Sequence, residues 1–91
     1  MKSRNTFRSI TEFMSEKLQE NVHKGGWEHD SVASLLTRLF EEAYEICESV
    51  RVGMPARSVY RECADVANFA MMIAENYERQ VLESCEGAER Q

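Results

Sequence analysis

Two pairs of acidic residues in this chain could bind a metal ion, because each pair is spaced to lie on one side of a helix. Glu62 and Asp65 stand three residues apart in the run RECADVANFAMMIA, residues 61–74, which is otherwise mostly apolar or small. Glu42 and Glu45 repeat this spacing earlier in the chain. A buried carboxylate without a partner is costly or takes up a proton. A hard divalent cation prefers carboxylate oxygens and would make such burial tolerable.

The helical period places these acids near the expected core. At about 100° per residue, Glu62 lies inside the apolar stripe of its helix, and Asp65 lies about 60° to one side. Glu42 falls at the edge of an earlier apolar stripe, with Glu45 further out. Carboxylates about 5 Å apart repel by roughly 3 kcal/mol per pair at an effective dielectric constant near 20. We therefore expect all four acids to be ligands of Mg²⁺, with Mn²⁺ as a possible substitute.

Two other interpretations of the acids remain open at this point. Single acidic residues on helices are usually solvated, and this alternative applies to each of the four. A di-iron carboxylate bundle would need Glu-x-x-His pairs. His23 and His29 lie in or beside a loop and form no such pair, so this competitor is weak.

The elements that must position the acids are helices, because the chain has one proline, four glycines and no alternating strand pattern. We expect the first helix to begin between Asn5 and Ser9, with SITE at residues 9–12 as a possible capping box. Glycines in HKGGWEHD, residues 23–30, favour a loop, and Asp30 or Ser31 can cap the second helix.

The second and third helices carry the acids. Apolar residues from Val32 to Val50 predict a helix that stops at Gly53. Pro55 suits the first turn of a third helix that runs towards Gly87. Short connections between long helices favour antiparallel neighbours. The predicted fold is an all-α bundle of three main helices per chain, completed by oligomerisation.

The composition limits the kind of protein. We expect residues 1–91 to form one domain, with residues 1–5 and 86–91 frayed, and so small a chain to be marginal unless it forms a homo-oligomer, a dimer or a tetramer. The net charge of −5 argues against a nucleic acid polymer as the main partner. Neither a signal peptide nor a membrane helix is visible. The three cysteines lack CxxC spacing and indicate reduced thiols in a cytoplasmic protein.

The two acidic pairs also form a recognisable order. EEAYE at residues 41–45 and ECAD at residues 62–65 make EExxE, sixteen intervening residues and ExxD. This arrangement resembles the signature of the MazG-like all-α nucleoside triphosphate pyrophosphohydrolases, a superfamily that includes dimeric dUTPases and dCTP pyrophosphatases. The similarity covers about residues 35–74. HKGGW, residues 23–27, also looks like the loop that approaches the nucleotide in small MazG-like proteins.

The resemblance implies an enzyme that hydrolyses a nucleoside triphosphate to the monophosphate and pyrophosphate. By position, Glu42, Glu45, Glu62 and Asp65 would be the metal ligands. Glu41 would orient or deprotonate the attacking water. Such chemistry fits these residue types, because metal ions offset triphosphate charge and lower the pKa of a bound water. The chain is short for the family, so a partner subunit is expected to complete the substrate pocket.

Three further residues are candidates for substrate binding, each with a structural alternative. Trp27 could stack on a nucleobase or cap the end of the core. Lys24 could contact phosphate or simply be solvated. Asn68 could bond a base or sugar, or satisfy a neighbouring helix. At the level of the whole protein, the alternatives to an enzyme are a catalytically silent helical interaction module and a nucleotide-binding regulator.

Overall fold

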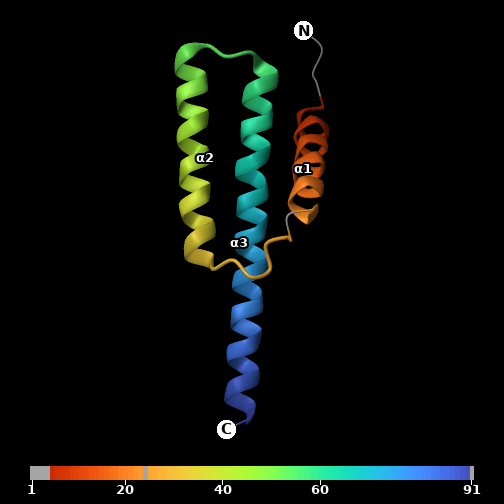
Figure 1. The fold of residues 1–91 in the computed structure, drawn as a ribbon, viewed down its shortest axis with the longest axis vertical. Helices are drawn as coiled ribbons and strands as arrows, with labels where there is room; N and C mark the ends of the chain where they lie inside the picture. Colours follow the sequence, from red (N-terminus) through yellow and green to blue (C-terminus); the bar gives the residue numbers. More distant parts are fainter. Residues whose placement is uncertain (1–4, 24, 91) are drawn as a thin grey trace.

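Three helices make up the computed structural model, which describes residues 5–23 and 25–90 (Figure 1). They are α1 (Thr6–His23), α2 (Val32–Val52) and α3 (Ala56–Arg90), and no strand occurs within these residues. The predicted all-α class is therefore confirmed. Fraying of residues 1–5 and 86–91 stays a prediction, although α3 is helical to Arg90.

Both ends of α2 follow the expected capping chemistry. The side chain of Ser31 accepts a hydrogen bond from the backbone N–H of Ser34 at 3.0 Å, which satisfies a free donor of the first turn. Gly53 ends the helix with φ 77°, a left-handed conformation that glycine adopts without steric cost. The next residue, Met54, donates to Ser49 O at 2.9 Å. Ser31 is thus the cap of the two predicted candidates, and the stop at Gly53 is confirmed.

The first helix begins one turn earlier than the possible capping box suggests. Asn5 Oδ1 accepts from the backbone N–H of Arg8 at 2.9 Å, so Asn5 caps α1. Ser9 and Glu12 consequently lie inside the helix and do not form its N-terminus. The expected start between Asn5 and Ser9 is confirmed, whereas the possible capping box at residues 9–12 is not the cap, because a better placed asparagine precedes it.

α3 is the central element, with α2 on one flank and α1 on the other (Figure 1). α2 and α3 run antiparallel, as the short turn between them requires. α1 and α3 run parallel, and the segment between α1 and α2 crosses α3 (Figure 1). The expectation of antiparallel neighbours thus holds for α2 and α3, whereas α1 packs against α3 and not against the next helix in the chain.

A hydrogen-bonded latch holds this crossing segment on α3. Asn76 is 3% exposed, and its Nδ2 donates to Trp27 O at 3.0 Å and to Asp30 O at 2.9 Å. Arg79 Nη1 donates to Asn76 Oδ1 at 2.7 Å and to Glu28 O at 3.3 Å. We call Asn76, Arg79 and these carbonyls the latch. It fixes where Trp27 lies relative to α3.

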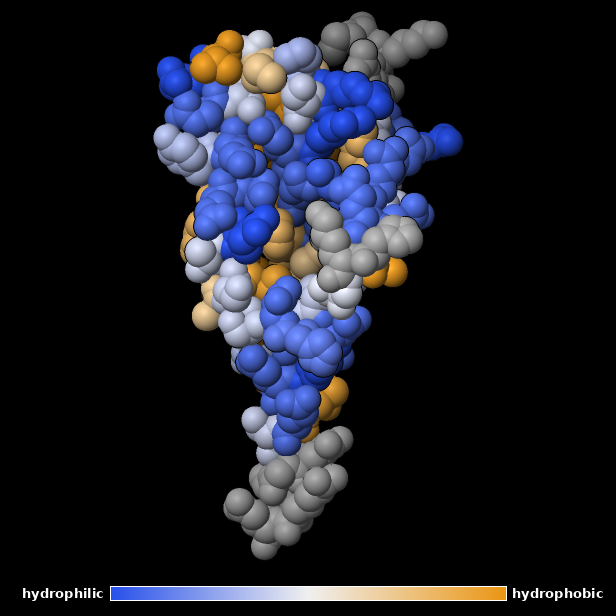
Figure 2. Space-filling model, in the orientation of Figure 1, coloured by the Kyte–Doolittle hydropathy of each residue, from blue (hydrophilic) through white to orange (hydrophobic). Residues whose placement is uncertain are grey.

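The hydrophobic core is small. Among the described residues, the buried hydrophobic side chains are Phe13, Leu35, Ala64 and Met72. The guanidinium groups of Arg57 and Arg61 cover the ring of Phe13 at 5.1 and 5.2 Å, which extends the contact between α1 and α3. Hydrophilic residues cover most of the visible face, and apolar residues show at its margins and in the hollow between the helices (Figure 2).

Candidate metal and nucleotide site

Acidic side chains from all three helices lie near one cavity of about 150 Å³, which we call the acid cavity. It lies between α1 and α2, over α3. Charged and polar residues from each helix line it: Lys17 and Glu20 from α1, Arg38 and Glu42 from α2, and Asp65 and Asn68 from α3. The structure therefore brings Glu42 and Asp65 to one cavity, as the helical period predicts.

Glu42 is the acid with the most strongly shifted protonation. Its side chain is 14% exposed, and its pKa is raised from 4.5 to about 7. Burial is the largest cause, and the neighbouring carboxylates of Glu45 and Asp65 raise the pKa further. The charge of Arg38, whose Nη2 lies 3.7 Å from Glu42 Oε1, opposes the shift.

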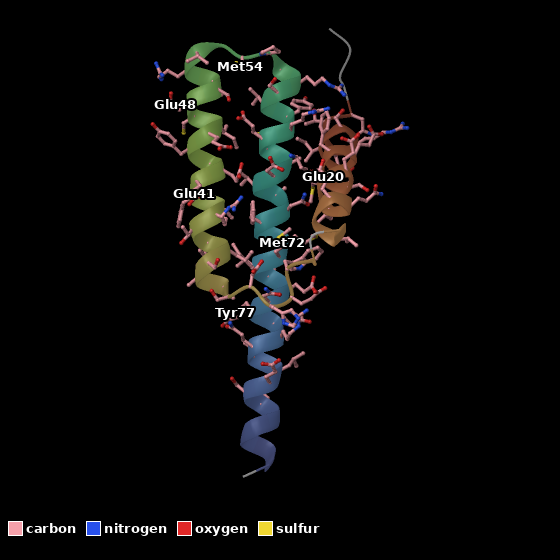
Figure 3. The ribbon with its side chains drawn as sticks, in the orientation of Figure 1. Glu20, Glu41, Glu48, Met54, Met72 and Tyr77 are labelled. Atoms are coloured by element: carbon pink, nitrogen blue, oxygen red, sulfur yellow. The ribbon has the colours of Figure 1, made fainter. Side chains whose placement is uncertain are left out.

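Asp65 is half-buried on α3, and burial is again the main cause that raises its pKa. The charge of Lys17 acts in the opposite direction, whereas Glu45, Glu20 and Glu62 add to the rise. Glu20 was not predicted as a site residue. It lies on α1 (Figure 3) and lines the acid cavity. This depends on the packing of α1 against α3, which no local sequence pattern predicts.

Glu62 and Glu45 complete the predicted ligand set in different surroundings. Glu62 is half-buried, and its Oε1 is shielded from solvent without a hydrogen-bond partner among the described residues. A buried acceptor without a partner costs roughly 1–3 kcal/mol, so this oxygen favours a ligand that supplies positive charge. Glu45 is exposed on α2, close enough for its charge to act on Glu42 and Asp65.

The four carboxylates influence one another through their charges but do not converge on one point. Among the residues whose side chains are described, no three Asp, Glu, His or Cys residues are arranged to hold a metal ion together. Oxygen donors, an unpartnered buried carboxylate oxygen and raised pKa values fit a hard cation chemically. The assignment of Glu42, Glu45, Glu62 and Asp65 as ligands stays a prediction.

Glu41 lies apart from the acid cavity. Its side chain is 61% exposed, and its Oε2 lies 3.7 Å from Arg38 Nε (Figure 3). It is not among the residues that line the acid cavity. The predicted role of Glu41 in orienting or deprotonating water stays a prediction.

Trp27 lines a second cavity of about 230 Å³, which we call the aromatic cavity. The indole Nε1 is buried and has no hydrogen-bond partner among the described residues. The two cavities adjoin, because Arg38, Phe69 and Met72 line both. Trp27 thus borders a space beside the acids. Lys24, the other predicted contact from this loop, lies outside the described residues.

Asn68 satisfies a neighbouring helix, which was one of its two predicted roles. It is 2% exposed, and its Nδ2 donates to Met14 O on α1 at 3.1 Å. Its Oδ1 is buried and has no partner among the described residues. Asn68 therefore ties α1 to α3 and keeps one unused acceptor at the wall of the acid cavity.

Asn76 and Arg79 are functional candidates that the sequence pattern did not single out. Through the latch they hold the backbone of residues 27–30, and so they position Trp27 at the aromatic cavity. An asparagine in an apolar helical stripe was the available signal. Its partners are backbone carbonyls, which have no residue-specific signature.

Known proteins do not add to this description. Models of protein families, curated proteins and solved structures were compared with the chain, and none of the three comparisons found a match. None of the helices in residues 5–23 and 25–90 combines the length and the apolar character that crossing a membrane requires.

Proposed function

We propose that this protein is a metal-dependent nucleoside triphosphate pyrophosphohydrolase, which converts a (deoxy)nucleoside triphosphate to the monophosphate and pyrophosphate. The observation that carries the proposal is the pair of adjoining cavities. One is lined by acids and cations, and the other by Trp27. A nucleotide has the same division, with an aromatic base joined through a sugar to a polyanion.

Glu42, Glu45, Glu62 and Asp65 are the proposed ligands of Mg²⁺. The bound ion would neutralise charge on the triphosphate and make a coordinated water more acidic. The protein's own residues bind and orient the substrate. Trp27 offers a stacking surface for the base, and the latch holds that surface in place.

A screen for pyrophosphate release tests the proposal. The wild type is incubated with the canonical and several modified nucleoside triphosphates, in Mg²⁺ or Mn²⁺, and the products are separated by chromatography. We expect monophosphate and pyrophosphate in equal amounts. Stepwise loss of single phosphates would indicate a phosphatase, and no pyrophosphate from any nucleotide would contradict the enzyme.

A matched pair of glutamate-to-glutamine variants tests whether the reaction depends on the proposed metal ligands. Glu62→Gln should lower kcat about 100-fold or more, because it removes charge stabilisation that matters most in the transition state. Glu48→Gln is the control, since Glu48 lies outside both cavities and pairs with Arg51 at 2.6 Å. Equal losses in the two variants would remove the metal site from Glu62.

The second candidate function is a catalytically silent interaction module. The observation in its favour is that no three acids converge on one point among the described side chains. A nucleotide-binding regulator is the intermediate case, in which the cavities bind a nucleotide without turnover. Calorimetry with nucleotides separates these two, because only the regulator binds them.

We also propose that the enzyme is a cytoplasmic homo-oligomer, a dimer or a tetramer. The three cysteines are free thiols, which suits a reducing compartment. The core within the chain is small, and α3 carries a stripe of small and apolar residues at alternating four- and three-residue spacing, which is typical of helix pairing. The stripe comprises Cys63, Ala67, Ala70, Ala74, Tyr77 and Val81.

Light scattering tests the oligomer. The mass of the wild type should be a multiple of 10.5 kDa at micromolar concentration. Ala70→Glu should dissociate it by placing a charge in the stripe, since Ala70 is exposed within one chain. Gln80→Glu adds the same charge outside the stripe and should leave the mass unchanged. A wild-type monomer would rule the oligomer out.

A further inference from the structure

The acidic residues at and near the acid cavity would repel a triphosphate unless positive charge offsets them. The four proposed ligands, of which Glu42 and Asp65 line the acid cavity, carry twice the charge of one divalent ion when all are ionised. A single bound metal would then leave net negative charge facing a triphosphate. At short range such like charges repel strongly. A site that accepts a polyanion therefore needs cations of its own, placed beside the acids.

Lys17 on α1 is one such cation. It lines the acid cavity, and its charge acts on Asp65 across the α1–α3 contact. Its nearest described carboxylate, Glu20 Oε2, lies 3.9 Å from Nζ, which is too far for a hydrogen bond. The ammonium group is thus positioned at the cavity with its donors not engaged by Glu20.

The buried Asn68 ties the part of α1 that carries Lys17 to α3. The Asn68–Met14 hydrogen bond joins α1 to α3 three residues before Lys17 and three residues after Asp65. Asn68 lines the acid cavity and is 2% exposed, and its Oδ1 is buried without a partner among the described residues. The cavity therefore combines unused donor capacity at Lys17 with an unused acceptor at Asn68.

Arg38 on α2 is the second cation, and it lies where the two cavities meet. Its guanidinium is 5.4 Å from the centroid of Phe69, a cation–π distance. Its closest contacts with Glu41 and Glu42 are both 3.7 Å. Arg51 and Arg79, in contrast, reach their helix-neighbour carboxylates at 2.6 and 3.0 Å. Arg38 therefore has donors available for a further ligand.

We propose that Lys17 and Arg38 are the phosphate-binding pair of this site, with different phosphates assigned to each. Arg38 lines both cavities, so it binds the phosphate next to the nucleoside, which the monophosphate product keeps. Lys17 lines the acid cavity and not the aromatic one, so it binds the two outer phosphates, which leave as pyrophosphate. The assignment of the two phosphates rests on the proposed function.

Calorimetry on full-length variants tests the pair. The probes are inorganic tripolyphosphate, a set of nucleoside triphosphates with a methylene bridge between the first two phosphates, and the matching monophosphates, all with Mg²⁺. Lys17→Met keeps most of the stem and removes the charge. It should weaken binding of tripolyphosphate and of the triphosphates about tenfold, and leave monophosphate binding unchanged. Arg38→Met should weaken binding of both nucleotide classes.

Two controls separate a phosphate contact from an indirect effect. Arg51→Met removes an exposed cation that lines neither cavity and should leave all affinities unchanged. Lys17→Arg should restore most of the lost affinity. Titration of Lys17→Met with Mg²⁺ alone shows whether Lys17 instead supports the acidic residues. Because the substitution removes a positive charge beside Asp65, the affinity for Mg²⁺ should be equal to that of the wild type or higher. If Lys17 only supported the acids, metal affinity would fall with phosphate affinity.

The outcomes distinguish this inference from the proposed function. If the wild type binds tripolyphosphate but releases no pyrophosphate from nucleotides, the enzyme is excluded, and weaker tripolyphosphate binding by Lys17→Met but not by Arg51→Met still supports Lys17 as a phosphate ligand. Failure of the wild type to bind tripolyphosphate would overturn the phosphate-binding pair. If the wild type turns nucleotides over and Lys17→Met behaves like Arg51→Met, Lys17 is not a phosphate ligand and the enzyme stands. A loss of monophosphate and triphosphate affinity by equal factors in Lys17→Met would overturn the assignment of the outer phosphates.

Discussion

Two buried asparagines on α3 lie in regions of opposite character. Asn76 belongs to the latch, where its Nδ2 donates twice and its Oδ1 accepts from Arg79. Asn68 belongs to the acid cavity, where its Nδ2 donates once and its Oδ1 has no partner among the described residues. Each is at most 3% exposed, so burial does not distinguish them.

The difference in hydrogen bonding between the two asparagines indicates that the latch is structural, whereas the acid cavity has polar groups available to a ligand. In the latch, the hydrogen-bonding groups of Asn76 are used within the chain. Asn68 Oδ1 at the acid cavity and Glu62 Oε1, on a side chain whose charge acts on Asp65, are buried without partners in the described part of the chain. Burial also raises the pKa values of Glu42 and Asp65. Unpartnered buried polar groups cost stability, and a protein that keeps several together gains from a ligand that satisfies them.

The largest effect on stability should come from breaking the latch. Asn76→Ala removes three hydrogen bonds and leaves two backbone carbonyls to find other donors. We expect a loss of about 2–3 kcal/mol in the free energy of unfolding, with a decrease in Tm of roughly 10–20 °C. Urea unfolding followed by circular dichroism measures it. A loss below about 0.5 kcal/mol would show that the latch does not fix the crossing segment.

A smaller effect of opposite sign should come from Glu42→Gln in metal-free protein. The folded-state pKa of Glu42, about 7, lies above its usual value of 4.5, so the folded state binds this proton more tightly. The resulting stabilisation is present below pH 4.5 and is lost as the pH rises towards about 7. Glutamine resembles the protonated acid, so the variant should be more stable at pH 8 by about 1–2 kcal/mol.

The pH profile supplies the control for Glu42. Near pH 4, wild type and Glu42→Gln should have the same stability, since both side chains are then neutral. Addition of Mg²⁺ at pH 8 should stabilise the wild type more than the variant, because a ligand of the folded state raises its stability. If Glu42→Gln were less stable than the wild type at pH 8 in the presence of a chelator, the ionised Glu42 would not destabilise the metal-free fold, contrary to this prediction.

The smallest effect should come from Asn68→Ala. This change removes one hydrogen bond, but it also removes the buried Oδ1 that has no partner, so the two contributions partly offset. We expect a loss of about 1 kcal/mol or less, clearly below that of Asn76→Ala. The same unfolding experiment measures both variants. A larger loss in the free energy of unfolding for Asn68→Ala than for Asn76→Ala would contradict the distinction between the fully hydrogen-bonded latch and the acid cavity with its unpartnered groups.

Much of the fold was predictable because its signals are local. The caps at Ser31 and Gly53 and the helical period define α2 and the start of α3 without knowledge of the rest. The path of the chain between α1 and α2 was not predictable. It depends on side chains of Asn76 and Arg79 that bind backbone carbonyls about 50 residues away in the sequence, and any residue type can supply a carbonyl.

The candidate site, like the fold, was predictable only in part. Glu42 and Asp65 could be placed at one cavity from the helical period, because both lie on helices that pack side by side. Lys17 and Glu20 could not, since their approach depends on α1 lying against α3 and not against its neighbour in sequence. Convergence of the four predicted ligands depends on side-chain torsions, which no spacing rule specifies.

The length of α3 has a consequence for how the protein moves through solution. Its lower part extends beyond the other two helices (Figure 1), and the molecule measures 60 × 26 × 24 Å. The radius of gyration is 16.3 Å, whereas a compact chain of this length would have about 12 Å. A single chain should therefore elute from a gel-filtration column earlier than a sphere of equal mass. Its rotational diffusion should also be anisotropic, so nuclear relaxation rates should differ between N–H bonds parallel and perpendicular to α3.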